Sequence, residues 1–214
     1  MSDDKSGSPP CGIYIRIDNY SDMMRLITNL RQMAMTINRA SGYEKNMDVV
    51  ELVYKAEADE EIGDLVALIQ AEGLVAIISG LEEFEDIKDA DGVLLDDAGL
   101  YQDARSILGE DAIIGISCGA DKDKAQKAID MEADFVVLNG DPSLISWFSA
   151  QSTMMSVASS AGISNHNCGE FVRSGAGFMD VTDYILEHEK GVMQGTVNIM
   201  HAIDLAGQVK GSVN

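Results

Sequence analysis

Two adjacent aspartates, Asp96 and Asp97, end a short apolar run, "GVLLDD" at 92–97. Carboxylate oxygens are preferred ligands of Mg²⁺, so the pair is a candidate metal site. Asp97 also stands just before an expected helix at 99–110. An aspartate in that position commonly caps a helix by accepting hydrogen bonds from its first backbone N–H groups. The sequence alone leaves both roles open.

Lys55 is the candidate phosphate-binding residue. It lies near the end of an expected strand, "MDVVELVYKA" at 47–56, among apolar and acidic residues. The ammonium group of a lysine at a strand end can hold a phosphate or diphosphate as a point charge. The alternative is an ion pair with Glu57 or Glu60.

Ser117 and Cys118 end another expected strand, "AIIGISCG" at 112–119. Cys118 is a candidate nucleophile or proton-transfer group. No partner base is evident in the sequence, and most such cysteines are buried, which favours a packing role. His166, at the start of an expected helix, is the one histidine expected near the same site. The three histidines lack metal-ligand spacing.

These residues belong to a regular alternation of short apolar runs and amphipathic segments, which predicts eight strand–helix units. The strands are expected at 12–18, 47–56, 74–80, 92–97, 112–119, 134–140, 154–162 and 177–185. The helices are expected at 21–40, 57–72, 81–90, 99–110, 121–133, 143–152, 165–175 and 189–207. Continuous apolar strands separated by helices indicate a parallel sheet covered by helices. Eight units predict a single-domain (β/α)₈ TIM barrel.

The alternative fold is an open, doubly wound sheet, which needs fewer strands and is not supported by any GxGxxG or P-loop pattern. The barrel is expected at 12–207, between a disordered N-terminal tail at 1–11 and a C-terminal tail at 208–214.

In such a barrel the C-terminal ends of all strands meet at one face, where functional residues lie. The predicted strand ends are Asp18, Asn19, Lys55, Ser79, Gly80, Asp96, Asp97, Ser117, Cys118, Gly119, Asn139, Gly140, Asp141, Ser160, Ala161, Gly162, Thr182 and Asp183. Lys55 is the one basic residue among them, so an anionic ligand is expected to bind near it.

The charge balance limits the partners of the chain. It has 36 acidic and 15 basic side chains and a net charge of −21. Such a surface repels phosphate backbones and anionic lipid, so neither nucleic acid nor a membrane is an expected partner. The 3 cysteines have no C-x-x-C spacing, which is typical of a cytoplasmic protein. No apolar stretch reaches the roughly 18 residues that a membrane span needs.

Four segments resemble the thiamine-phosphate synthase and thiazole tautomerase family. They are "MDVVELVYKAEADEEIGDLV", "ADGVLLDDAGLYQDARSILGEDAIIGISCG", "EADFVVLNG" and "SAGISNHNCGEFVRSGAGFMDVTDYI". The resemblance covers about 12–190 and implies a (β/α)₈ barrel. It also implies condensation of a hydroxymethylpyrimidine diphosphate with a thiazole phosphate, with Mg²⁺ and basic residues holding the diphosphate.

The resemblance places Lys55 on the family's lysine and Ser117 on its strand-five serine. The family's glutamine and arginine before that lysine are replaced by Glu51 and Val53. Other functional positions differ as well: Ser79 and Gly80 replace an asparagine–aspartate pair, Gly99 replaces a metal-binding aspartate, Ala161 replaces one of two phosphate-binding glycines, and Asp183 replaces the strand-eight serine.

The expected protein is therefore a divergent member of this family that has lost most of its diphosphate- and metal-binding residues. The remaining candidates for phosphate binding are Lys55, Ser117, Ser160 and Gly162, with Mg²⁺ at Asp96 and Asp97. The alternatives are a non-catalytic or regulatory barrel, or an enzyme acting on another small phosphorylated molecule. The sequence leaves open whether the chain forms a homo-oligomer.

Overall fold

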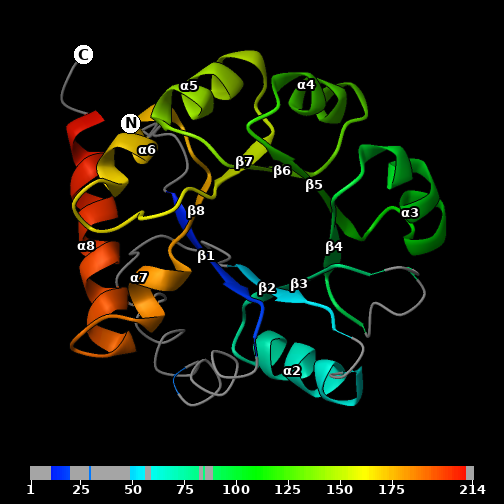
Figure 1. The fold of residues 1–214 in the computed structure, drawn as a ribbon, viewed down its shortest axis with the longest axis horizontal. Helices are drawn as coiled ribbons and strands as arrows, with labels where there is room; N and C mark the ends of the chain where they lie inside the picture. The colour runs from blue at the N-terminus through cyan, green and yellow to red at the C-terminus, as the bar shows by residue number, and fades with distance from the viewer. Residues whose placement is uncertain are drawn as a thin grey trace, which may run out of the picture.

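The computed structural model describes residues 11–19, 29, 49–55, 59–81, 84 and 89–210. Eight strands form one closed barrel in the order β1 to β8. Every neighbouring pair is parallel, including β1 with β8. Figure 1 looks into this ring, with helices around its outside. The predicted single-domain (β/α)₈ barrel is confirmed.

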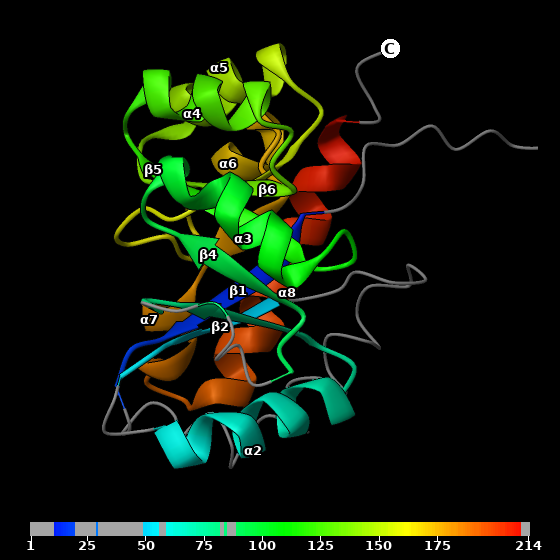
Figure 2. The same cartoon turned by 90° about the vertical axis from the view of Figure 1, so that its right-hand side faces the viewer.

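The strands are β1 Gly12–Ile17, β2 Val49–Val53, β3 Val75–Ser79, β4 Gly92–Leu95, β5 Ile113–Gly119, β6 Phe135–Leu138, β7 Met155–Ala158 and β8 Phe178–Asp180. The helices are α2 Asp59–Ala71, the 3₁₀ turn η3 Ala98–Leu100, α3 Tyr101–Leu108, α4 Lys122–Asp130, α5 Pro142–Gln151, α6 Cys168–Ser174, α7 Thr182–Leu186 and α8 Val192–Lys210. Figure 2 shows α2 and α4 on opposite sides of the barrel.

The last predicted strand is wrong in its second half. The apolar run at 177–185 suggests one long strand, but β8 ends at Asp180 and α7 begins two residues later. The carboxylate of Asp180 accepts hydrogen bonds from the backbone N–H and the hydroxyl of Thr182. Such a local side-chain bond competes with the strand and turns the backbone into a helix.

Both predicted tail boundaries also shift. Cys11 is 4% exposed and packs in the core, next to Gly12, whose N–H donates to Gly177 O. At the other end, α8 continues to Lys210 instead of ending at 207. The predicted helix at 21–40 lies outside the described residues except for Asn29, which is helical, and so does most of the one at 81–90.

Two apolar layers hold the barrel together, because strand side chains alternate between its inside and its helix-facing outside. The inside layer contains Tyr14, Val75, Ile77, Leu94, Phe135, Val137 and Val157. On β5 the outward residues Ile114, Ile116 and Cys118 pack in the larger, outer core. Between them, Gly115 leaves room for Phe135, since a Cβ at Gly115 would lie 2.2 Å from that ring.

Two aspartates secure the N-terminal end of the barrel. The Asp91 carboxylate, just before β4, accepts from Ala76 N at 2.7 Å. Asp134, just before β6, accepts from Ile114 N at 2.8 Å and pairs with Arg105 Nη2 at 2.6 Å. Both follow an alanine in the same sequence pattern, "AD" before an apolar run. These contacts satisfy backbone N–H groups at the end of the barrel opposite the expected site.

Candidate functional site at the mouth of the barrel

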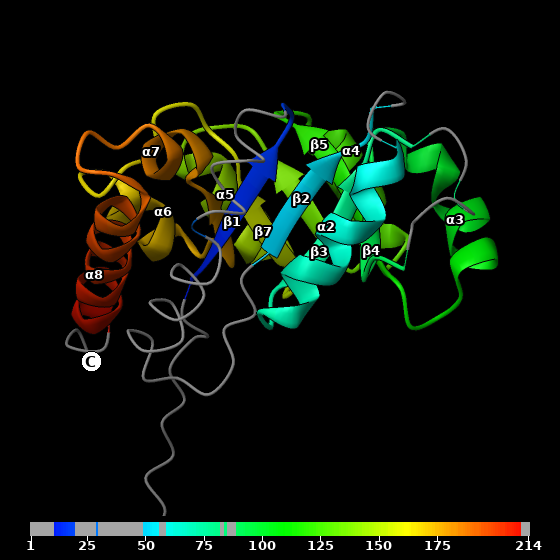
Figure 3. The ribbon, with the colours of Figure 1, turned by 90° about the horizontal axis from the view of Figure 1, so that it is seen from below.

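The C-terminal ends of the strands open at the end of the barrel where α7 lies, as the arrowheads of β1 and β2 show in Figure 3. On β1, alternation puts both Tyr14 and Arg16 on the inward side. Arg16 pairs in register with Glu51 of β2, which in turn lies beside Ile77 of β3. The register therefore brings a cation and a carboxylate together at the mouth, although 35 positions separate them in the sequence.

Glu51 is the centre of a buried polar cluster. Its side chain is only 2% exposed. One carboxylate oxygen accepts from the Tyr14 hydroxyl at 2.8 Å. The other accepts from the Ser79 hydroxyl at 2.5 Å and from Arg16 Nε at 3.3 Å. A buried carboxylate is costly unless it is paired and hydrogen-bonded, and these donors meet that requirement.

Tyr14 acts as a hydrogen-bond donor in this cluster. Burial, followed by the negative charge of Glu51, raises the pKa of the Tyr14 hydroxyl well above its ordinary value. The phenol therefore keeps its proton and holds the Glu51 carboxylate in place.

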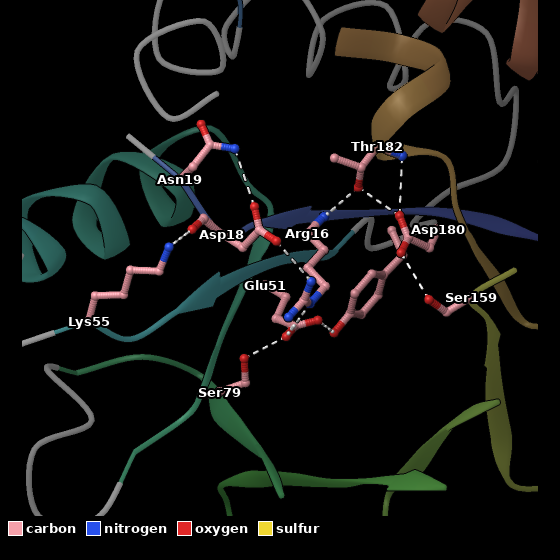
Figure 4. Close-up of polar contacts among 10 residues, drawn as sticks. Arg16, Asp18, Asn19, Glu51, Lys55, Ser79, Ser159, Asp180 and Thr182 are labelled. Atoms are coloured by element: carbon pink, nitrogen blue, oxygen red, sulfur yellow. Dashed lines mark hydrogen bonds and ion pairs between the residues drawn. The ribbon is translucent and has the colours of Figure 1, made fainter. Parts of the chain in front are cut away.

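The cations at the mouth are engaged by acceptors of the same chain. Arg16 Nη1 forms an ion pair with Asp18 at 3.2 Å, in addition to the bond from Arg16 Nε to Glu51. Lys55 Nζ donates to the backbone carbonyl of Asp18. Figure 4 shows Arg16 between Glu51 and Asp18, with Lys55 reaching the same turn from β2.

A second polar cluster surrounds Asp180 at the end of β8. One oxygen accepts from the Thr182 hydroxyl at 2.7 Å and from Thr182 N at 3.2 Å. The other accepts from the Ser159 hydroxyl at 3.0 Å. The Thr182 oxygen also accepts from Arg16 N at 2.7 Å, so this cluster joins β7, β8 and β1 (Figure 4).

A cavity of about 230 Å³ lies between these clusters and the loops after β6, β7 and β8. Its lining is mainly polar and includes Arg16, Asp18, Asn139, Ser160, Gly162 and Asp183. The cavity is large enough for a small molecule, and the loops after strands seven and eight often form a ligand site in this fold.

The predicted phosphate-binding residues are only partly brought together. Ser160 and Gly162 line the cavity, although the Ser160 hydroxyl donates to Gly140 O. Ser117 lies on the inward side of β5, paired with Val137 of the inside layer. Lys55 is exposed and does not line the cavity. Phosphate binding by these residues stays a prediction.

The two aspartates after β4 make different contacts. The Asp97 carboxylate accepts from Gly99 N at 2.8 Å and caps η3, which is the alternative that the sequence left open. Asp96 is exposed, and its backbone carbonyl accepts from Lys124 Nζ. Among the described residues, no group of three or more His, Cys, Asp or Glu side chains could hold a metal ion. Mg²⁺ binding at this pair stays a prediction.

Cys118 points away from the mouth. It is 3% exposed in the outer core, and its Sγ donates to Ile116 O at 3.5 Å. Burial raises the pKa of the Cys118 thiol to about 11, so it is a thiol rather than a thiolate at neutral pH. His166 lies at an adjoining surface hollow of about 430 Å³ beside α7 and α8, which shares Asp183 and Tyr184 with the cavity.

Three residues of the site were missed from the sequence: Arg16, Glu51 and Asp180. Lys55 is not the one cation near the mouth, because the Arg16 side chain reaches it from within β1. The alternation in "GIYIRID" could have indicated this, since Arg16 shares the side of Tyr14 and not that of Ile15 and Ile17.

None of the described helices is long and apolar enough to cross a membrane.

The fold and the mouth define the chain as a single-domain (β/α)₈ barrel with a polar cavity at the C-terminal ends of its strands. No protein-family model matches the sequence. Among barrels of this class, the chain is similar to thiamine-phosphate synthases in both sequence and fold. The thiamine-phosphate synthase of Rhodospirillum centenum (strain ATCC 51521 / SW) is 26% identical, and the match covers 66% of this chain and 77% of that protein.

The solved structures show the same fold. The thiamine phosphate pyrophosphorylase from Pyrococcus furiosus aligns with a TM-score of 0.72 at 16% identity, over 91% of this chain and 96% of that one. The orotidine 5'-phosphate decarboxylase from Pyrococcus horikoshii OT3 aligns with a TM-score of 0.70 at 14% identity, over 90% of this chain and 99% of that one. At identities this low, the solved structures show a shared fold, and the function has to be argued from the residues of the site.

Proposed function

We propose that this chain is a thiamine-phosphate-synthase-like barrel that binds a small molecule at its mouth and does not condense a pyrimidine diphosphate with a thiazole phosphate. The observation that carries the proposal is the engagement of Arg16 by Glu51 and Asp18. These two carboxylates already offset the charge of the guanidinium, so it attracts a diphosphate much less than a free guanidinium would.

The charge of the mouth supports the loss of that reaction. The carboxylates of Asp18 and Glu51 bind the guanidinium of Arg16, and Asp180 and Asp183 add two further carboxylates to the lining of the cavity. A diphosphate would bring further negative charge to this site. Electrostatic stabilisation is commonly the largest part of catalysis, and losing one such contact can cost about 10²–10³-fold in rate.

The same cavity supports binding. Its described lining offers hydrogen-bond acceptors at Asp18 and Asp183, and an amide at Asn139. A small polar molecule that carries amino or hydroxyl groups fits this lining. The similarity to thiamine-phosphate synthases makes thiamine and its separate pyrimidine and thiazole halves the first compounds to test.

A thermal-shift screen tests the proposal. A ligand that binds only the native state stabilises it by about 2.7 kcal/mol at a concentration of 100 times Kd. We expect at least one unphosphorylated compound of this series to raise the melting temperature. We also expect no thiamine phosphate to form when both condensation substrates and Mg²⁺ are supplied. Clear turnover would contradict the loss of the reaction, and the absence of any shift would contradict binding of this series.

A pair of variants locates the ligand. Asn139→Ala removes a polar side chain from the cavity and should weaken binding about tenfold, as expected for one lost hydrogen bond. Gln126→Ala is the matched control, because Gln126 is exposed on α4 and bonds to Asp130, away from the cavity. Equal affinities of the two variants would place the ligand elsewhere.

A second candidate is an enzyme that acts on another phosphorylated molecule, since the loops after β7 and β8 commonly hold phosphate in this fold. It requires a divalent cation to offset the carboxylates of the mouth. We would expect stabilisation by a phosphorylated ligand that depends on Mg²⁺ and weakens in an Asp96→Asn, Asp97→Asn double variant. A shift that is the same with and without Mg²⁺ would remove this candidate.

A further inference from the structure

Asp180 holds three hydrogen-bond donors at the edge of the cavity. They are the Ser159 hydroxyl at the end of β7, the Thr182 hydroxyl, and the Thr182 backbone N–H. The donors come from two loops and converge on the two oxygens of one carboxylate, as Figure 4 shows. The Thr182 hydroxyl is itself positioned by Arg16 N, which donates to its oxygen at 2.7 Å.

Hydroxyl and backbone N–H groups after strands seven and eight are the kind of donors that hold a phosphate in a (β/α)₈ barrel. Here they already bind an anion, the Asp180 carboxylate. A phosphate at this place would lose these donors and would also meet the charge of Asp180. Like charges at such short range repel strongly where water is partly excluded.

The other charges of the cavity do not reverse this effect. Asp18 and Asp183 are also part of its lining. Arg16 is the one cation among the described residues that line it, and Glu51 and Asp18 already bind the guanidinium.

We infer that Asp180 is a specificity-determining residue: its carboxylate takes the place of a ligand phosphate, so that the cavity rejects phosphorylated molecules and accepts uncharged or cationic ones. This inference rests on the proposed function for the position of the ligand. It predicts that a phosphorylated compound binds the wild-type protein much more weakly than its unphosphorylated counterpart, in the absence of divalent metal.

Inorganic phosphate is the probe that tests the role of Asp180 directly. Asp180→Ala releases the donors of Ser159 and Thr182 and removes the charge. We expect the variant to bind phosphate about tenfold more tightly than the wild type, or better, in calorimetry or phosphorus NMR at low ionic strength. Wild-type protein that binds phosphate as tightly as Asp180→Ala would overturn the inference.

Asp183→Ala is the matched control. It removes one charge from the same cavity, but no hydrogen bond joins the Asp183 side chain to Ser159 or Thr182 in the described structure. The gain in phosphate affinity should therefore be clearly smaller than for Asp180→Ala. Equal gains would mean that charge alone excludes phosphate, and the specific role of Asp180 would be wrong.

Folding of the variants is checked by circular dichroism, because Asp180 also turns the chain into α7. If Asp180→Ala does not fold, Asp180→Asn removes the charge in the same shape, and a phosphate affinity no higher than that of the wild type would overturn the inference.

The proposed function and the role of Asp180 can fail independently of each other. A gain of phosphate binding without any ligand in the thermal-shift screen would contradict only the proposed function. A phosphorylated ligand that binds the wild type without metal, in competition with its unphosphorylated counterpart, would contradict only the role of Asp180.

Discussion

At the scale of single residues, the site depends on two carboxylates that the sequence does not mark as important. Glu51 and Asp180 each lie in the middle of an apolar run. Each gains its role from partners on other strands, which only the register of the barrel brings together. The strand ends could be predicted from the sequence, and two of the residues named there, Ser160 and Gly162, line the cavity. The pairing of Arg16 with Glu51 could not, because it depends on contacts between β1 and β2.

Replacing Glu51 by alanine should destabilise the fold by about 1–3 kcal/mol, since the buried hydroxyls of Tyr14 and Ser79 lose their acceptor. The partly exposed Arg16 can turn to water and should add little. Urea denaturation followed by circular dichroism measures the change. Glu51→Gln keeps the shape and one acceptor, so it should lose less. A free energy of unfolding that is the same in all three proteins would show that the cluster does not stabilise the fold.

Cys118 should make stability depend on pH in the alkaline range. Burial raises the pKa of its thiol from 9.0 to about 11 in the folded state. The folded protein therefore holds this proton more tightly than the unfolded chain does, and stability falls as the pH rises from about 9 to about 11. The slope from this group is at most about 1.4 kcal/mol per pH unit. Cys118→Ser should show a smaller fall over this range, and an identical fall would assign the effect to other groups.

At the scale of elements, the alternation of apolar strands and amphipathic helices was enough to place the barrel. Parallel strands buried on both sides give continuous apolar runs, which the sequence shows clearly. The errors lie where a local side-chain bond ends an element early, as Asp180 does for β8. A run such as "GFMDVTDYI" has the composition of a strand throughout, so its turn into α7 is not visible from apolar residues alone.

The contacts of Asp134 just before β6 are expected to stabilise the fold. Asp134→Ala removes the acceptor of Ile114 N and the ion pair with Arg105, and should cost about 1–2 kcal/mol of stability. Asp130→Ala is the control, because that carboxylate is exposed on α4 and accepts a single bond from Gln126. Urea denaturation of both variants gives the comparison. If both variants lose the same free energy of unfolding, the contacts of Asp134 before β6 do not stabilise the fold more than an exposed carboxylate does.

At the scale of the whole molecule, the net charge of −21 opposes the compact state through self-repulsion. Added salt screens this repulsion, since the Debye length falls from about 30 Å at 0.01 M to about 10 Å at 0.1 M. We expect the melting temperature to rise over this range of sodium chloride. Chloride is the suitable anion, because sulfate stabilises proteins by exclusion from their surface. A melting temperature that stays constant or falls would show that local ion pairs outweigh the net charge.

The joint between the first and last strands has a consequence for how the molecule is made. β1 and β8 pair over only three positions, Gly12 with Phe178, Ile13 with Met179, and Tyr14 with Asp180. During synthesis on the ribosome, β1 leaves the exit tunnel first and keeps one open edge until residues 178–180 follow. An open strand edge invites pairing with other chains. The cavity also depends on this closure, because its lining includes Arg16 from the first strand and Asp180 from the last. The cavity therefore forms only when the ring closes, and a molecule bound between β1 and β8 would stabilise the contact that closes it.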